Sequence, residues 1–307
     1  MSTHPPTSVL LPTVSPTAVV GELTEQLSPS DELLVVCDSE TDAIADAVAD
    51  RPENVRLVVA GEPDGCSGKA NAVAAGMEAA SNDRLVWTDD DFHHPADWLD
   101  RLNGDYDRHG PTTELPFFVG RDPLAVLLEP LYAVAGTVGT YAGDIAWGGA
   151  VVFERDDLPD WDAFLCDLGR TVSDDGLLTD RVDITPVWRT RRVEMGGTIR
   201  ESLERHVRFT KLGRHHDPAG STTNAVLGTL ATIGGLAFPL PVAAVLTLAL
   251  ACVYTAAGRR RWTFLLAYPA VMISMPLMLY GLARRTFVWG GRRYRWREPF
   301  DVESEGV

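Results

Sequence analysis

Three consecutive aspartates, Asp89, Asp90 and Asp91, end an apolar run that begins at Leu85. Charge that follows a buried strand is typical of α/β proteins, because their ligands bind at the carboxyl ends of the strands. Adjacent carboxylates repel one another, and a hard divalent cation relieves the repulsion by taking oxygen ligands from them and from a phosphate. Alternate residues of an extended chain share a face, so Asp89 and Asp91 can converge on one ion while Asp90 points elsewhere. These residues predict a Mg²⁺ or Mn²⁺ site, and a solvated acidic turn is the alternative.

Two further polar residues, Asp38 and Lys69, precede the aspartates in the chain and could contact the same ligand. Asp38 ends the apolar run 32–37, where a carboxylate can accept hydrogen bonds from ribose hydroxyls or a base N–H, or can cap the next helix. Lys69 follows a glycine-containing loop and is one of only two lysines, which favours a specific contact over a solvated helix face. The loop is not a Walker A motif, because its glycine spacing is wrong and Ala70 stands where the magnesium-binding hydroxyl would be.

The elements that must position these residues alternate along the chain. Helical periodicity and apolar runs that end at turn residues distinguish the two kinds of element. The alternation indicates a mainly parallel sheet covered on both faces, so the expected fold class is α/β with a doubly wound, nucleotide-binding domain. The expected strands are 8–14, 32–37, 55–60, 84–88, 114–119, 147–154 and 186–193, and the expected helices are 16–27, 39–50, 69–80, 95–102, 123–138, 161–168, 174–182 and 198–212.

Composition narrows the classes of partner. The chain has 43 acidic and 27 basic residues and a net charge of -16, which argues against nucleic acid as a ligand. Many acids with almost no lysine resemble the proteins of salt-loving archaea, in which excess negative charge keeps proteins soluble. The four cysteines form no C-x-x-C pair, so neither a zinc site nor a disulfide framework is indicated. His93 and His94 are expected in an exposed loop, because no further ligand cluster is spaced to join them.

Long apolar segments dominate the C-terminal third. Residues 225–257 and 262–283 carry no charge, and a membrane span needs about 20 apolar residues. We expect a transmembrane region at 222–285 with about two spans, the first being one long kinked helix or a re-entrant pair, because Pro239 and Pro241 interrupt it. A buried helical hairpin of a soluble protein is the alternative. The preceding helix 198–212, with Ile199, Leu203, Val207 and Leu212 on one face, is expected to lie along the bilayer surface.

The positions of the arginines indicate which side of the membrane each segment occupies. Two spans place both ends of the chain on the same side, and the six arginines of 284–297 favour the cytoplasm for that side. The cluster 259–261 then falls in a short outer loop, which goes against the positive-inside tendency. The expected organisation is a cytoplasmic domain at 1–214, the transmembrane region, and a cytoplasmic tail at 286–307.

The ordered motifs resemble glycosyltransferase family 2, the inverting, membrane-attached enzymes with a GT-A fold, and within it the ceramide-glucosyltransferase-like branch. The resemblance covers residues 8 to about 214 and loosely the tail. Two departures are Asp174, where the family usually has Glu, and Phe209, where it has Trp. The motifs that carry it are Asp38, Gly65–Asn71 (GCSGKAN), the D-x-D of Asp89–Asp91, Ser173–Asp175, Arg205–Phe209 (RHVRF) and Phe287–Trp296 (FVWGGRRYRW).

The resemblance implies a role for each matched residue. Asp175 is the general base, and Asp89 and Asp91 hold the metal against the diphosphate. Helix capping is the alternative for Asp174, a strand-entry turn for the glycines at 148 and 149, and lipid headgroup binding for the arginines. The donor-binding residues are Asp38, Lys69, Asp90, Arg205 and Arg208, and the acceptor-binding residues are Gly149, Asp174 and Phe209.

The implied function is transfer of a sugar from a nucleotide-sugar donor, a UDP- or GDP-sugar, to a hydroxyl of a lipid or lipid-linked glycan. The implied location is the cell membrane, with several spans and a cytoplasmic catalytic domain. The implied cofactor is Mg²⁺ or Mn²⁺, and the partners are the donor, the acceptor and the membrane, without nucleic acid. Two alternatives stay open: a processive polysaccharide synthase, and a catalytically silent scaffold that binds sugar nucleotides.

Overall fold

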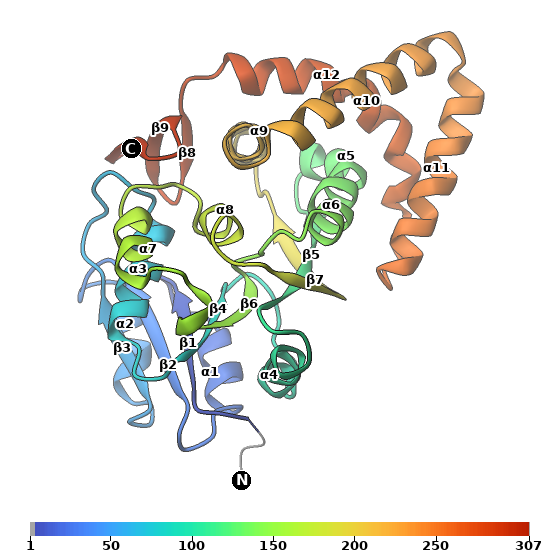
Figure 1. Cartoon of the computed structure of the whole chain (residues 1–307). Coiled ribbons are helices and arrows are strands. Elements are labelled where there is room, and N and C mark those ends of the chain that lie inside the picture. Colours follow the sequence, from blue (N-terminus) through green and yellow to red (C-terminus); the bar gives the residue numbers. More distant parts are fainter. Residues whose placement is uncertain (1–3, 307) are drawn as a thin grey trace. The chain divides into compact units, whose positions relative to one another are not determined.

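The computed structural model describes residues 4–306 (Figure 1). These residues divide into two compact units that interleave along the sequence. The first unit comprises Met1–Leu115, Gly143–Val187 and Pro299–Ser304. The second comprises Pro116–Ala142, Trp188–Glu298 and Glu305–Val307. The expected division at residues 214 and 285 stays a prediction.

One seven-stranded sheet organises the chain in the order β3-β2-β1-β4-β6-β5-β7. Strand β1 pairs in parallel with β2 and β4, β2 pairs in parallel with β3, and β6 runs antiparallel to β4 and β5. The predicted α/β class with a mainly parallel sheet is confirmed, and the direction of β6 is the feature that was not predicted. The strands are β1 (Thr7–Pro12), β2 (Glu32–Cys37), β3 (Val55–Val59), β4 (Arg84–Thr88), β5 (Thr112–Gly120), β6 (Ala150–Glu154) and β7 (Thr185–Met195).

The central strands are buried on both faces, as their uninterrupted apolar runs predict. Leu10 on β1 lies opposite Leu34 on β2 and Trp87 on β4. The Trp87 ring meets Phe153 of β6 edge-on at 5.2 Å and stacks on Phe164 at 6.2 Å. This packing holds the end of β4 firmly, and the three aspartates follow it.

Short helices cover the sheet in the first unit, and serine hydroxyls cap the first turn of α3 and of α8. The Ser67 hydroxyl caps α3 by accepting the N–H of Ala70, and the Ser173 hydroxyl caps α8 by accepting the N–H of Gly176. Lys69 and Asp174 therefore sit in the first turn of their helices. The helices are α1 (Val19–Thr24), α2 (Ala43–Ala49), α3 (Gly68–Ala79), α4 (Trp98–His109), the 3₁₀ turn η2 (Arg155–Asp157), α7 (Trp161–Leu168) and α8 (Asp174–Thr179).

The second unit holds the long apolar helices. The predicted segment 225–257 forms two helices that break at Phe238, where Pro239 begins the second helix and cannot donate a backbone hydrogen bond. Three stretches are long and apolar enough to cross a membrane, namely Pro123–Ala142, Pro239–Ala256 and Trp262–Ala283. The elements are α5 (Pro123–Tyr132), the π-helical turn η1 (Ala133–Val138), α6 (Gly139–Ala142), α9 (Ile199–His216), α10 (Pro218–Ala237), α11 (Pro239–Ala256), the 3₁₀ turn η3 (Trp262–Leu266) and α12 (Ala267–Ala283).

The tail forms a β-hairpin, which the sequence did not predict. Strands β8 (Phe287–Trp289) and β9 (Arg292–Glu298) pair antiparallel, and β10 (Asp301–Gly306) follows. The turn residues Gly290 and Gly291 have φ angles of 56° and 74°. Two consecutive positive φ angles suit the right-handed twist of a tight hairpin and favour glycine at both positions.

Candidate active site

An ion cluster in the first unit joins three motifs that lie far apart in the sequence. The Nζ atom of Lys69, in the first turn of α3, lies 2.7 Å from Asp89 Oδ1 at the end of β4. The same Nζ lies 3.4 Å from Asp174 Oδ2, in the first turn of α8. The side chains of Lys69, Asp89 and Asp174 are 15%, 24% and 2% exposed. The fold thus brings together a predicted donor residue, a predicted metal ligand and a predicted acceptor residue.

Gly148 adds a fourth motif to this cluster. A Cβ atom at this position would lie 2.8 Å from Asp174 Oδ2 and 3.3 Å from Lys69 Nζ. Any larger residue would press on the pair, so the glycine is needed for the close approach of the backbone. Its neighbour Gly149, the predicted acceptor residue, instead lies under the Trp147 ring, whose atoms a Cβ would meet at 2.4 Å.

The charges of the cluster are unequal. Burial alone would lower the pKa of Lys69, but Asp174, Asp89 and Asp175 outweigh it and raise that pKa, so the ammonium stays charged. Burial raises the pKa of Asp174 to about 7, against the pull of Lys69 and with the help of the negative Asp175 and Asp89. One cation therefore faces three carboxyl groups, of which Asp174 is partly protonated near pH 7.

The predicted metal ligands fit a hard cation by their chemistry. Asp89 is partly accessible and Asp91 is exposed, directly beyond the end of β4. Among residues 4–306, no three His, Cys, Asp or Glu side chains gather as a metal site. Mg²⁺ commonly takes only one or two carboxylates and fills its other positions with water and substrate phosphate, so a pair of aspartates is a suitable donor set. Asp90 is exposed, and its Oδ2 accepts a hydrogen bond from the Thr13 hydroxyl at 2.6 Å.

Asp38, the predicted contact to the nucleotide, lies at the carboxyl end of β2. The alternative role for this residue was capping of the helix that follows. Asp42 occupies the N-cap position of α2, but its side chain makes no hydrogen bond to the helix; its Oδ2 instead accepts the backbone N–H of Asp38 at 3.0 Å and that of Ser39 at 2.8 Å.

The loop after the aspartates is anchored by residues that the sequence analysis missed. His94 is buried, which corrects the expectation of an exposed loop, whereas His93 is exposed. The Thr88 hydroxyl lies 2.7 Å from His94 Nε2 and donates to the Gly149 carbonyl at 2.9 Å. Glu22 of α1 accepts the backbone N–H of His94 at 2.8 Å. The one sequence signal for this anchoring is the aromatic Phe92, whose ring packs against His94 at 4.1 Å.

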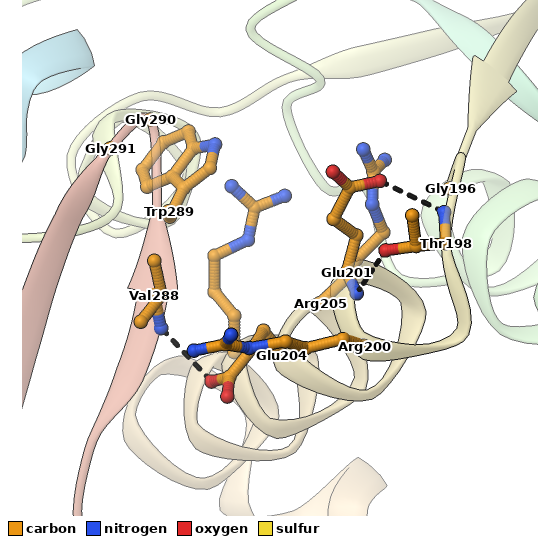
Figure 2. Close-up of a pocket in the computed structure, with 11 residues that line it drawn as sticks. Gly196, Thr198, Arg200, Glu201, Glu204, Arg205, Val288, Trp289, Gly290 and Gly291 are labelled. Carbon is orange, nitrogen blue, oxygen red and sulfur yellow. Dashed lines mark hydrogen bonds between the residues drawn. The ribbon is translucent and has the colours of Figure 1, made fainter. Parts of the chain in front are cut away.

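The second unit holds a separate pocket of about 580 Å³ between α9 and the β8–β9 hairpin (Figure 2). The guanidinium carbon of Arg208 lies 4.0 Å from the centre of the Trp289 ring, a cation–π contact. Trp289 is thus a pocket residue that the motifs pointed to only through the tail resemblance. The pocket is lined by Gly196, Thr198, Arg200, Glu201, Glu204, Arg205, Arg208, Val288, Trp289, Gly290 and Gly291.

The two acidic residues of this pocket are engaged within the protein. Glu204 pairs with Arg284 at 3.0 Å and accepts the Val288 N–H at 3.0 Å, and Glu201 forms a capping box with Thr198. Among the described residues, Arg200 and Arg205 have no carboxylate partner. The pocket therefore offers positive charge to an anionic ligand.

Phe209 lies elsewhere in the second unit. Its ring is 5.8 Å from Phe118 and 5.6 Å from Tyr132, within an apolar cluster that includes Leu277 of α12. Ile199, expected on the apolar face of α9, is 53% exposed, whereas Val207 is fully buried. The face that α9 buries is thus shifted from the predicted one.

The comparisons with known proteins bear on this site. Residues 17–132 match the sequence model of the glycosyl transferase family 2. No curated protein matches the chain.

The similarity to solved structures is low, both in sequence identity and in TM-score. Glucosyl-3-phosphoglycerate synthase from Mycobacterium tuberculosis, in complex with Mn²⁺, UDP-glucose and phosphoglyceric acid, is 20% identical, with 68% of this chain and 79% of that chain covered and a TM-score of 0.41. Mannosyl-3-phosphoglycerate synthase from Rubrobacter xylanophilus is 16% identical, with coverage of 68% and 72% and a TM-score of 0.42. TarS residues 1–349 from S. aureus, in complex with UDP-GlcNAc, are 13% identical, with coverage of 98% and 99% and a TM-score of 0.42.

The matched stretch contains three of the motifs described above. Asp38, Lys69 and the aspartates at 89–91 all fall inside it. The Asp174–Asp175 pair lies beyond it, as does the pocket lined by Arg205 and Arg208, which is called the arginine pocket below. The resemblance to glycosyltransferase family 2 is therefore confirmed for residues 17–132.

Proposed function

We propose that the protein is a membrane-bound inverting glycosyltransferase that moves a sugar from a UDP- or GDP-sugar to a hydroxyl of a lipid or lipid-linked glycan. The observation that carries the proposal is the contact of Lys69 with both Asp89 and Asp174. It joins the predicted diphosphate side of the reaction to the predicted acceptor side within the first unit. The family match over residues 17–132 supports the same class of reaction.

The donor half rests on the carboxyl ends of β2 and β4. Asp89 and Asp91 would hold Mg²⁺ or Mn²⁺, which supplies positive charge to the diphosphate as it leaves. Lys69, already charged, adds a second cation beside Asp89. Asp38 and Asp90 complete the donor set proposed for this unit.

The acceptor half rests on the first turn of α8. Asp174 is buried against Lys69, whereas Asp175 is half-buried and, within residues 4–306, accepts one long hydrogen bond of 3.4 Å from the Ser173 hydroxyl. Asp175 is therefore the carboxylate that is free to take a proton. It removes the proton of the acceptor hydroxyl as that oxygen bonds to the anomeric carbon, and the bond to the diphosphate breaks with its electron pair on the diphosphate. Asp174 and Gly149 are proposed on the acceptor side.

The arginine pocket is assigned to anion binding. Arg205 and Arg208 are proposed to bind the donor diphosphate, since guanidinium groups make strong hydrogen bonds to phosphate oxygens. Phe209 remains the proposed aromatic residue of the acceptor side, although its ring packs against Phe118 and Tyr132.

Membrane attachment supports the choice of a lipid acceptor. Within residues 4–306, three apolar stretches are long enough to cross a bilayer, and α9, with its seven charged side chains, comes before two of them in the chain. A cytoplasmic location of the catalytic domain is proposed, because the arginines of 284–297 favour the cytoplasm for that side of the membrane. A processive polysaccharide synthase is less well supported, because a conduit for a growing chain needs more spanning helices than this unit offers.

The test is release of nucleoside diphosphate by detergent-solubilised protein, supplied with Mn²⁺ and a panel of UDP- and GDP-sugars. Asp175→Asn should lower the rate by about 10²- to 10⁴-fold, the usual contribution of a general base, while donor binding stays unchanged. Asp162→Asn, which changes an exposed aspartate of α7, is the matched control. Wild-type turnover in Asp175→Asn would refute the base assignment. Donor binding without any release would identify a silent scaffold, and polymeric products would identify a processive synthase.

A further inference from the structure

In the second unit, both ends of α12 and the loop before it are attached to β7, α5 and α9. A helix that crosses a bilayer has its two ends on opposite sides, about 30 Å apart. The contacts of the loop 257–261, of α12 and of α10 therefore decide which of these segments can cross.

The loop between α11 and η3 is held by strand β7. Arg259 donates to the Thr190 carbonyl at 2.7 Å and to its hydroxyl at 2.9 Å. The indole N–H of Trp188 donates to the Ala256 carbonyl at 2.8 Å, and the Thr190 hydroxyl donates to the Ala257 carbonyl at 2.9 Å. The carboxyl end of α11 thus lies on a strand of the sheet, which cannot be on the far side of a membrane.

A buried carboxylate holds the start of η3 and α12. Glu129 of α5 is fully buried and accepts hydrogen bonds from Arg261 at 2.7 and 2.9 Å, and from the hydroxyls of Thr263 and Tyr254. Removing one partner of such a pair would leave an uncompensated charge in the interior, so this attachment is firm.

The other end of α12 lies on α9. Arg284 pairs with Glu204 at 3.0 Å, and Gly281 packs so closely on Thr210 that a Cβ atom would lie 2.5 Å from its hydroxyl. Between these ends, Leu277 packs in the apolar cluster with Phe209. Helix α9 has seven charged side chains in 18 residues and cannot lie in the hydrocarbon core. The carboxyl end of α12 is thus held by α9 and its start by Glu129 of α5, so α12 has both ends attached to this unit and does not reach the far side of a membrane.

Helix α10 is attached to α12 by hydrogen bonds. The Thr232 hydroxyl donates to the Val271 carbonyl at 3.3 Å, and the Tyr268 hydroxyl donates to the Gly235 carbonyl at 3.3 Å. These contacts set α10 antiparallel to α12, with the break at Phe238 beside the start of α12. The carboxyl end of α11 is thus tied to β7, and its start at Pro239 follows the end of α10 in the α10–α11 hairpin.

The outer faces of these helices are strongly apolar. The exposed fractions include 74% for Leu236, 82% for Leu240 and 68% for Leu248. A soluble protein does not leave a contiguous surface of this kind to water. Arginines of the tail and of α9 lie in the same unit, and positive charge suits the anionic headgroups that border a bilayer.

We propose that α10–α12 form a monotopic insert, which dips into one leaflet of a lipid bilayer through the α10–α11 hairpin and returns without crossing it. The loop 257–261 then lies on the same side as the tail, and its three arginines are no longer an exception to the positive-inside tendency. This inference rests on the membrane attachment proposed above and is independent of the reaction.

Thiol accessibility tests the inference in sealed membrane vesicles of known orientation. The background is Cys166→Ser with Cys252→Ser, which removes the two exposed cysteines. Single thiols are then placed by Arg260→Cys in the loop, Leu240→Cys at the hairpin and Glu303→Cys in the tail, all at exposed positions. The reagent is a membrane-impermeant maleimide whose mass shifts the protein on a gel.

We expect positions 260 and 303 to react from the same side, and position 240 to react from neither side until detergent is added. Reaction of position 260 from the side opposite to position 303 would overturn the proposal in favour of conventional spans. Reaction of position 240 from the far side would show that α10 and α11 cross the bilayer and would also overturn it. Recovery of the protein in the soluble fraction would refute the membrane attachment itself, whereas loss of sugar transfer with unchanged labelling would refute only the reaction.

Discussion

Replacement of Lys69 by methionine removes the single cation of the ion cluster. Methionine keeps much of the length and apolar volume of the lysine stem, so the change isolates the charge. Asp89, Asp174 and Asp175 would then face one another without the ammonium that now lies 2.7 Å from Asp89 and 3.4 Å from Asp174. Repulsion between these neighbouring carboxylates disfavours the folded state, and the effect is largest for Asp174 because it is buried.

The cost follows from burial. Removing one partner of a buried ion pair destabilises a protein by about 3–5 kcal/mol, and the partial exposure of Lys69 and Asp89 favours the lower end, about 3 kcal/mol. At about 2–4 °C per kcal/mol, the melting temperature should fall by on the order of 6–12 °C. Tryptophan fluorescence during heating of the detergent-solubilised protein measures this shift.

Two variants sharpen the measurement. Lys211→Met changes the only other lysine, on α9, and should cost no more than about 0.5 kcal/mol, as is usual for partly exposed sites. Asp174→Asn added to Lys69→Met removes one stranded carboxylate and should recover stability through a coupling energy of about 0.5–3 kcal/mol. Equal melting temperatures for Lys69→Met and Lys211→Met, or a further loss in the double variant, would refute the charge balance derived for the cluster.

Three other predictions concern the two units. Removal of divalent ions with EDTA should stop nucleotide release, and Mn²⁺ or Mg²⁺ should restore it; full activity after chelation would contradict the roles of Asp89 and Asp91. Trp289→Ala should weaken anion binding in the arginine pocket by about 0.5–2 kcal/mol, as judged by the Kd of the nucleotide diphosphate, because it removes the ring that Arg208 stacks on, whereas Trp289→Phe should keep most of the affinity. Glu129→Gln should lower the melting temperature by an amount equivalent to about 3–5 kcal/mol, since Arg261 would face a neutral amide, and an unchanged melting temperature would show that the contact does not hold η3.

The sequence predicted the elements best where composition changes sharply. The predicted bounds of β2, β4 and α7 agree with the structure at both ends, because each apolar or periodic run stops at a polar or glycine-containing turn. The reversed direction of β6 could not be predicted, since an apolar strand has the same pattern in either direction. The tail hairpin was also missed, because β8 has only three residues and β9 is rich in arginine, although the glycine pair at 290–291 is a hairpin signal.

The candidate site was predicted residue by residue, but its contacts were not. No spacing along the chain indicates that Lys69 would meet Asp174, because 105 positions separate them and only the packing of α3 and α8 beside β4 brings them together. The burial of His94 against Thr88 is likewise a tertiary effect. The break at Phe238, by contrast, follows from local chemistry, and the two prolines allowed it to be predicted as one of two alternatives.

The loop that carries Asp89, Asp90 and Asp91 can be anchored only after a much later part of the chain has been synthesised. The Thr88 hydroxyl binds the carbonyl of Gly149, which lies 61 positions later in the chain. At about 5–20 residues per second, a ribosome needs on the order of 3–12 s to add the residues between them. During that interval the three aspartates are already synthesised but lack the β6 strand beside β4, and contacts of such long range form slowly. A nascent chain that ends at Tyr132 would therefore contain the aspartates but lack β6, the strand that pairs with β4 where their loop begins.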